Sequence, residues 1–173
     1  MIRPRIVVSL LLAGALLAPA LAAFAASAPA IVYLTRHAEK ATEGKDPDLT
    51  APGHARARTL ARMLSKAGIT AIFSTPTNRT RQTALPLATQ SGTEVQLYDP
   101  AKPGAMVDRA RAAKGPVLVV GHSNTVPDLV KLFGGAPVAP IGDEEYDRLY
   151  QLVIHADGSV STVLLTSVVA PNP

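Results

Sequence analysis

Residues 116–120 read PVLVV, a short run that is apolar at every position. A strand with one face in water alternates apolar and polar residues, so an unbroken apolar run indicates a strand that is covered on both faces. Such strands are typical of parallel sheets with helices on either side. The run therefore predicts an α/β domain, and the sequence around it should alternate strands and helices.

The rest of the sequence has this alternation. Apolar runs predict further strands, and apolar residues at helical spacing, closed by glycine, predict helices. We expect a three-layer α/β/α sandwich with a mostly parallel central sheet. The expected strands are residues 31–35, 69–74, 95–98, 116–120, 149–155 and 160–165, the last two forming a hairpin around Asp157-Gly158. The expected helices are residues 52–67, a helix from Asn78 that bends or breaks at Pro86, and residues 103–114 and 124–133.

Residues 1–25 differ in composition from the remainder. Two arginines precede a long uncharged apolar stretch that ends in Ala23-Phe24-Ala25, with Ala26-Ser27-Ala28 as a second possible cleavage signal. A basic start, an apolar run and a small-residue end are typical of a secretory signal peptide. A membrane anchor is the alternative, but Pro19 and the small-residue end favour cleavage. We expect a signal peptide at 1–25, a single domain at 26–173, and a periplasmic or secreted protein without stable membrane association.

Charge and composition exclude several function classes. The formal charge of +4 falls to +2 without the two arginines of the signal, and neither a basic run nor a cluster of aromatic residues is present. Nucleic-acid binding is therefore not expected. The sequence has no cysteine, which excludes disulfides, zinc–thiolate sites and thiol redox chemistry. No long apolar surface stripe indicates a dimer, so we expect a monomer.

Polar residues follow three of the predicted strands. These are Thr35-Arg36-His37, residues 74–81 with their arginines, and residues 121–124, which read Gly-His-Ser-Asn. Because ligands bind beyond the carboxyl ends of strands in open α/β sheets, two histidines and two or three arginines should meet at one edge. Helices that begin there, at Asn78 and near Asn124, would add unpaired N–H groups that favour an anion. The pattern predicts a phosphate pocket that contains imidazoles.

The same residues match the motifs of a known family in their order along the chain. Arg36-His37-Ala38 stands in place of Arg-His-Gly, and Leu49-Thr50-Ala51-Pro52-Gly53 matches Leu-Thr/Ser-x-x-Gly. Residues 74–84 match Ser-x-x-x-Arg-x-x-Gln-Thr-Ala with one extra residue before the arginine, and Gly121-His122 follows a late apolar strand. Over residues 31–165 the sequence resembles the histidine phosphatase superfamily, which includes the phosphoglycerate mutases. The resemblance implies a phosphoglycerate mutase-like fold.

The resemblance also implies a role for each matched residue. His37 would be the nucleophile that becomes a phosphohistidine. Arg36, Arg79 and a protonated His122 would hold the phosphoryl oxygens. Ser123 and Asn124, which follow His122, are expected to contact substrate. The resemblance implies a small phosphorylated substrate and neither a metal nor another cofactor.

The general acid is less clearly indicated. Some family members carry an aspartate directly after the second histidine, where this chain has Ser123. Asp99, at the end of the third strand, is the first candidate, and a turn cap before Pro100 is its alternative role. Glu39, two residues after the nucleophile, is the second candidate, although it could equally form a surface ion pair with Lys40. Three further acidic residues of the loop that follows are expected to be solvated: Glu43, Asp46 and Asp48.

These features favour an exported phosphomonoesterase over a catalytically weak or inactive phosphate-binding protein of the same fold. The intact His37 supports the enzyme, because a binding protein needs no in-line nucleophile. The physiological substrate is not indicated: phosphohistidine proteins fit by size, and phosphorylated lipopolysaccharide sugars fit by location. Specificity is expected to lie in residues 40–51, 99–106 and 136–147. His54 and His155 match no functional position of the family.

Overall fold

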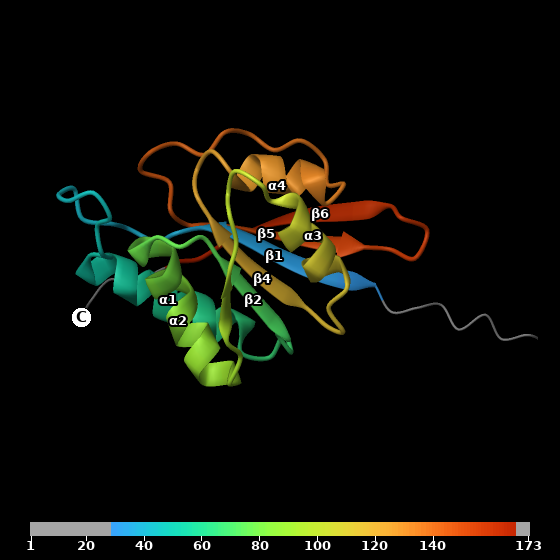
Figure 1. The fold of residues 1–173 in the computed structure, drawn as a ribbon, viewed down its shortest axis with the longest axis horizontal. Coiled ribbons are helices and arrows are strands. Elements are labelled where there is room, and N and C mark those ends of the chain that lie inside the picture. Colours follow the sequence, from blue (N-terminus) through green and yellow to red (C-terminus); the bar gives the residue numbers. More distant parts are fainter. Residues whose placement is uncertain (1–28, 169–173) are drawn as a thin grey trace, which may run out of the picture.

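A computed structural model describes residues 29–168, which form three layers around one six-stranded sheet (Figure 1). The helices α1 and α2 cover one face of the sheet, and α3 and α4 cover the other. The expected α/β/α sandwich is therefore confirmed. The strands are β1 (Ala30–Arg36), β2 (Ala71–Ser74), β3 (Val95–Leu97), β4 (Val117–Gly121), β5 (Arg148–Ile154) and β6 (Val160–Thr166). The helices are α1 (Ala51–Leu64), α2 (Asn78–Ser91), α3 (Gly104–Arg111) and α4 (Val126–Leu132).

The signal peptide expected at residues 1–25 lies outside the described part of the chain. Between residues 29 and 168, none of the helices has the length and apolar character needed to cross a bilayer.

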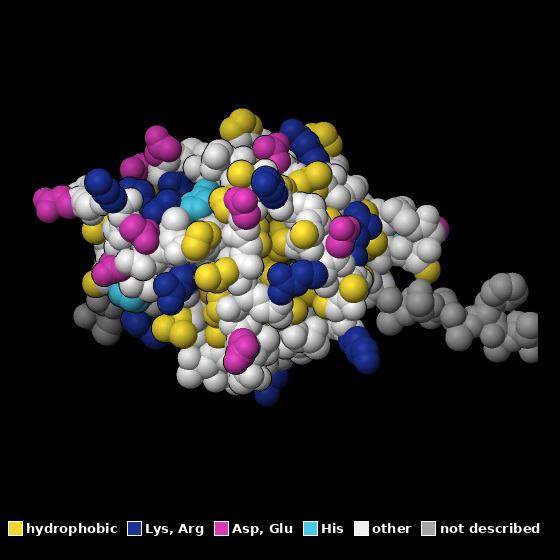
Figure 2. All heavy atoms as spheres, viewed as in Figure 1, with side chains coloured by type: hydrophobic (Ala, Val, Ile, Leu, Met, Phe, Trp, Pro, Cys, Tyr) yellow, Lys and Arg dark blue, Asp and Glu magenta, His cyan; other side chains and the backbone are white. Residues whose placement is uncertain are grey.

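The sheet has the strand order β3-β2-β4-β1-β5-β6. Strands β1 to β4 are parallel to one another, whereas β5 runs antiparallel to both of its neighbours, β1 and β6. Arg36 lies opposite Gly121, and Ser74 lies opposite Val120, so β1, β4 and β2 end at the same edge. This edge is on the left in Figure 1, and in the same view Lys, Arg and His side chains gather there among acidic ones (Figure 2).

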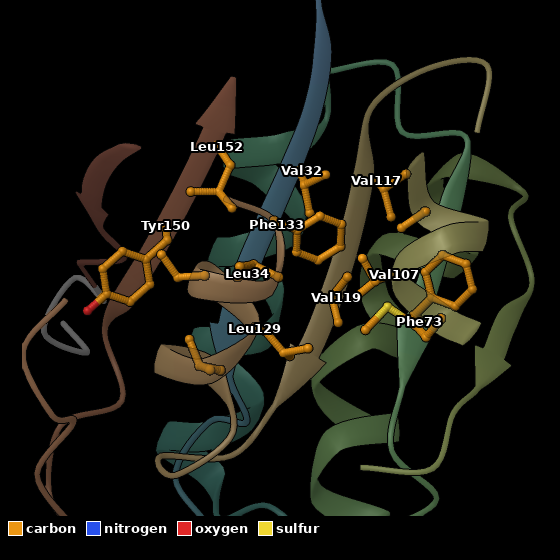
Figure 3. Packing of buried hydrophobic residues seen from close by; sticks show 14 of the residues in the cluster. Val32, Leu34, Phe73, Val107, Val117, Val119, Leu129, Phe133, Tyr150 and Leu152 are labelled. Atoms are coloured by element: carbon orange, nitrogen blue, oxygen red, sulfur yellow. The ribbon is translucent and has the colours of Figure 1, made fainter. Parts of the chain in front are cut away.

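The two faces of β4 explain the apolar run of residues 116–120. Val117 and Val119 face α3 and α4, whereas Leu118 and Val120 face α1 and α2, and all four side chains are fully buried. Figure 3 shows the first of these two cores, in which side chains of four strands meet those of α3 and α4. The strand is uniformly apolar because no position on it reaches water.

The helix limits follow local signals, but α1 and α3 each end three residues before the expected residues 67 and 114, and α2 and α4 differ as well. Helix α2 is not broken at Pro86; it continues to Ser91, because Leu87 and Ala88 on its buried face remain packed in the core. Its end is set by Gly92, which adopts φ +69°, a conformation that glycine reaches without strain. Helix α4 begins at Val126 rather than at Asn124, with Pro127 in its first turn.

The core between the sheet and α4 depends on Phe133, which is fully buried. Replacing Phe133 with Ala should lower the free energy of unfolding by about 3–5 kcal/mol, because apolar contact is lost and a cavity remains. Chemical denaturation measures this loss. Leu132→Ala is the matched control, since its side chain is 48% exposed and should cost far less. Equal losses for the two variants would contradict this assignment of the core.

Candidate active site

His37 directly follows β1, and within residues 29–168 only one of its two ring nitrogens has a hydrogen-bond partner. Its backbone N–H donates to Gly121 O at 3.0 Å, which extends the β1–β4 pairing by one residue. Its Nδ1 lies 2.8 Å from the carbonyl oxygen of Ala38, and a carbonyl only accepts, so Nδ1 carries the proton. Nε2 has no hydrogen-bond partner within residues 29–168. The backbone thus selects the tautomer whose Nε2 lone pair can act as a nucleophile.

The surroundings of His37 keep its side chain neutral at neutral pH. The residue is only 3% exposed, and this burial lowers its pKa to about 3, helped by the charges of Arg36, His122 and Arg79, although the bond to Ala38 opposes the shift. The ring centroid of His122 lies 5.5 Å away in an edge-on arrangement. A neutral imidazole among positive groups is suited to attack an anionic phosphoryl group, because those groups attract the substrate while the nucleophile keeps its lone pair.

Arg36 is fixed by a turn that lies more than a hundred residues further along the chain. Its Nη1 donates to the carbonyls of Gly142, Asp143 and Glu145 at 2.8, 2.8 and 3.0 Å. The Tyr146 ring lies against the guanidinium, with its centroid 4.1 Å from Cζ. The buried Nε has no partner in the described structure. The guanidinium is therefore locked in place with donor capacity left over, as an anion site requires.

His122 follows Gly121 at the neighbouring strand end. Its Nε2 lies 2.9 Å from Thr75 Oγ1, and its backbone N–H donates to Thr125 Oγ1 at 2.9 Å. Burial, together with the charges of Arg79 and Arg36, lowers its pKa to about 4, while Asp46 opposes the shift. Among these groups of the protein, His122 is thus neutral at neutral pH. The protonated state expected from the sequence needs a bound dianion to raise this pKa again.

The loop that follows β1 contributes an unexpected contact to the site. Asp46 is exposed as expected, and in addition its carboxylate accepts from Asn78 N at 3.0 and 3.1 Å, at the start of α2. The same carboxylate lies 3.4 Å from Arg79 Nη1. Asp48 is also engaged, since it accepts from Gln82 Nε2 at 2.8 Å. The amino end of α2, where an anion was expected, is therefore covered by a carboxylate of the chain itself.

The two candidate acids lie in different environments. Both carboxylate oxygens of Glu39 accept from Arg56, at 2.6–3.0 Å. Partial burial acts to raise the pKa of Glu39, but the hydrogen bonds and charge of Arg56 outweigh it and lower this pKa. Asp99 is exposed, and its Oδ1 accepts from Ala101 N at 2.9 Å, which is the turn-cap arrangement. Its role as an acid stays a prediction.

The expected substrate contacts lie beside His122. Ser123 is half-buried and Asn124 is exposed. Both line a cavity of about 340 Å³ that also borders α4 and the segment before β5. Their contact with substrate stays a prediction.

Two residues that the sequence interpretation missed complete the site. Thr75 is fully buried on His122, and it stands four residues before Arg79. If the motif is aligned from Thr75 instead of Ser74, its Ser-x-x-x-Arg spacing is exact, with threonine in place of serine. No extra residue before the arginine is then needed. Tyr146 has no such signal, because its contact with Arg36 depends on the path of a distant loop.

The substitution of alanine for the usual glycine at position 38 fits without strain. Ala38 is buried against Leu49 and Ala57, and its N–H donates to Thr83 Oγ1 at 2.9 Å. Gly53, in contrast, has no room for a side chain, since a Cβ there would lie 2.1 Å from Glu39 O. Thr50 caps α1 by accepting from Gly53 N at 3.2 Å. The Leu-Thr-x-x-Gly motif thus seats α1 directly against the backbone of the active-site loop.

No group of three or more His, Cys, Asp or Glu residues in the described chain is arranged to hold a metal ion. The positive charge of the site comes from Arg36 and Arg79, with the two imidazoles available for protonation.

Comparison with known proteins agrees with this geometry. The family model of the histidine phosphatase superfamily (branch 1) matches residues 32–100, which confirms the resemblance over that segment. No curated protein matches the chain. The matched segment contains His37, Arg36 and Arg79, but His122 lies beyond it.

Solved structures extend the similarity to the whole fold. A mycobacterial glucosyl-3-phosphoglycerate phosphatase aligns with TM-score 0.66 and 14% identity, over 80% of this chain and 99% of its own. A phosphoserine phosphatase from Entamoeba histolytica aligns with TM-score 0.60 and 16% identity, over 80% and 98%. A candidate phosphohistidine phosphatase, SixA, from Nakamurella multipartitia aligns with TM-score 0.61 and 21% identity, over 83% and 99%. At these identities the structures establish the phosphoglycerate mutase-like fold.

The depressed histidine pKa values predict how stability depends on pH. In the unfolded chain His37 and His122 become protonated below about pH 6.5, whereas in the folded protein they stay neutral until about pH 3–4. The unfolded state therefore binds more protons between these values, and the free energy of unfolding falls as the pH decreases. Between pH 7 and pH 5 the wild type should lose about 1–2 kcal/mol more than His37→Gln, which lacks one of these groups. Denaturant titrations at both pH values measure the difference. Parallel losses in the two proteins would contradict a buried neutral His37.

Proposed function

We propose that this chain is a phosphatase that hydrolyses a phosphomonoester through a phosphohistidine intermediate on His37. One observation carries the proposal: a neutral His37, whose Nε2 has no hydrogen-bond partner in residues 29–168, lies within the influence of the charges of Arg36, Arg79 and His122. The match of residues 32–100 to the histidine phosphatase superfamily supports the same chemistry.

The reaction has two displacements at phosphorus. First, the lone pair of His37 Nε2 forms the N–P bond while the P–O bond to the leaving group breaks, and the leaving oxygen takes a proton from a general acid. Then water attacks phosphorus, the N–P bond breaks, and the proton lost by the water returns to the carboxylate. Inorganic phosphate leaves and the neutral imidazole is restored.

Positive charge around the phosphoryl group lowers both barriers. Arg36 is already locked by three carbonyls and the ring of Tyr146, so its guanidinium needs little reorganisation when charge develops. The second arginine, Arg79, and a protonated His122 would complete the set. These groups supply the charge that a metal ion supplies elsewhere, so we propose a metal-independent reaction that needs no cofactor.

Asp99 is the proposed general acid. Tyr98 N donates to Ser74 O at 3.0 Å, which extends the β3–β2 pairing and puts Asp99 one residue beyond the same sheet edge. Only its Oδ1 is engaged, by Ala101 N. Glu39 is less suited, because Arg56 occupies both of its oxygens and stabilises the deprotonated form.

The proposed setting is the periplasm or the exterior, reached through a signal peptide at residues 1–25, with a monomeric mature domain at residues 26–173. The proposed partner is a small phosphorylated molecule, and neither nucleic acid nor a membrane is proposed. The cavity beside Ser123 and Asn124 would receive part of the leaving group.

A phosphate-binding protein with weak or no turnover is the second candidate. The observation that favours it is Asp99 itself, which is exposed and serves as a turn cap. Such a protein would bind inorganic phosphate through the same arginines and release none from a phosphomonoester.

The first test is phosphate release by the purified protein from an aryl phosphate. His37→Ala should abolish release, because no other group can form the intermediate. His155→Ala is the matched control: this histidine is exposed, contacts Ser161, and should leave activity unchanged. A chelator should have no effect. Absence of turnover in the wild type, together with binding of phosphate measured by calorimetry, would favour the binding protein.

The second test separates the two acids by leaving group. Asp99→Asn should lower kcat for an alkyl phosphate by about 10²-fold or more, yet spare an aryl phosphate whose leaving group needs little protonation. Steady-state kinetics on both substrates measure the ratio, with Glu39→Gln as the comparison. If Glu39→Gln alone produces the selective loss, the assignment of Asp99 is wrong.

A further inference from the structure

A buried chain of hydroxyl groups lies behind His122, and the proposed reaction does not yet use it. Thr75 and Thr80 are fully buried, and their Oγ1 atoms lie 2.9 Å apart. Thr75 Oγ1 lies 2.9 Å from His122 Nε2, and Thr80 Oγ1 lies 2.8 Å from Thr77 Oγ1. Three threonines at the β2–α2 junction therefore connect in sequence to one ring nitrogen of the site.

Backbone carbonyl groups fix the direction of the hydroxyl proton at the Thr80 end of this series of threonines. Thr80 Oγ1 lies 3.0 Å from the carbonyl oxygen of Thr75 and 2.9 Å from that of Thr77. Carbonyls accept only, so the Thr80 proton is directed to one of them, and Thr80 can then accept from Thr75. The Thr75 hydroxyl in turn has a lone pair facing His122. With this direction of donation, the hydroxyls of Thr75 and Thr80 each donate one hydrogen bond and accept another, provided that Nε2 of His122 carries a proton.

We propose that Thr75 is a positioning residue that accepts from Nε2–H of His122 and thereby leaves Nδ1 as the nitrogen that faces the phosphoryl group. Nδ1 of His122 has no hydrogen-bond partner in residues 29–168. When a phosphate dianion binds, Nδ1 takes up a proton, and the imidazolium keeps both of its N–H groups paired. This inference rests on the proposed function, since it names the group that lets His122 act as a cation.

The charges around His122 make this acceptor necessary. Arg36 from β1 and Arg79 from α2 disfavour a cation there, whereas Asp46 from the loop after β1 favours one, and the neighbouring His37 is neutral. A bound dianion shifts this balance toward the imidazolium. Without the Thr75 oxygen, the imidazolium would still hold a buried N–H with no acceptor, and that loss would oppose its formation.

Thr75→Val tests the inference, because valine keeps the branched shape and removes the hydroxyl. We expect kcat/KM for an aryl phosphate to fall about 10- to 100-fold, as for an unpaired buried donor. The alkaline limb of the kcat profile should also move to lower pH, because the pKa of His122 in the complex falls. Thr75→Ser should restore both values. Thr59→Val is the matched control, since Thr59 is a buried threonine of α1 whose Oγ1 accepts from Arg62.

A second measurement is independent of activity. Imidazole ¹⁵N spectra of the wild type should show the proton of neutral His122 on Nε2, and Thr75→Val should shift population to the Nδ1–H form. A wild-type His122 protonated on Nδ1 would overturn the inference. So would a Thr75→Val protein with lowered kcat and an unmoved pH profile, which indicates a structural role alone.

The two proposals can fail separately. If the wild type has no turnover, the proposed function fails, yet the ¹⁵N spectra still decide the tautomer. If Thr75→Val does not fold, Thr80→Val replaces it: it keeps the hydroxyl on His122 but removes the acceptor behind it. We expect a smaller shift of the pH profile in the same direction, and an unchanged profile would overturn the inference.

Discussion

The hydrogen bond from His37 N to Gly121 O is the contact on which the site depends. It continues the parallel pairing of β1 and β4 past the end of β1, so His37 and His122 emerge side by side at one edge. Gly121 is required at that point, because a Cβ would lie 2.8 Å from Thr125 Oγ1. The two buried cores on either side of the sheet make this edge rigid. If His37 is the nucleophile, as we propose, a position set by strand pairing leaves it little to reorganise before attack.

Buried positive charge is the second constraint. Arg36 and Arg79 each have a buried Nε without a partner in the described part of the chain, and both imidazoles are kept neutral by burial and by the charges of these arginines. Other groups of the protein offset part of the free-energy cost of burying these charges. Backbone carbonyls and the ring of Tyr146 contact Arg36, and Asp46 forms an ion pair with Arg79. A phosphate dianion would complete the compensation. The site is therefore electrostatically matched to its proposed substrate rather than to solvent.

Local patterns were sufficient wherever a property depends on neighbouring residues. The uniform apolar character of β4 and the start of α2 at Asn78 are both readable from a few positions. The break expected at Pro86 is absent from α2 because burial of Leu87 and Ala88 outweighs one missing helical hydrogen bond. Asp46 is exposed as expected, but its contact with α2 was not foreseen, since its partner lies 32 residues away. Thr75 had a signal in its spacing to Arg79, but only its burial on His122 reveals a use for the hydroxyl.

The sequence by itself determined the layer order, the strand ends that carry His37 and His122, and the arginines that follow them, because side-chain periodicity and motif spacing are local properties. The tertiary structure alone decided which ring nitrogens of His37 and His122 have hydrogen-bond partners and how residues 142–146 hold Arg36. It also decided that Glu39 pairs with Arg56. These outcomes depend on distances between segments that are far apart in the chain. Such distances are fixed only when the cores close, so no pattern along the sequence contains them.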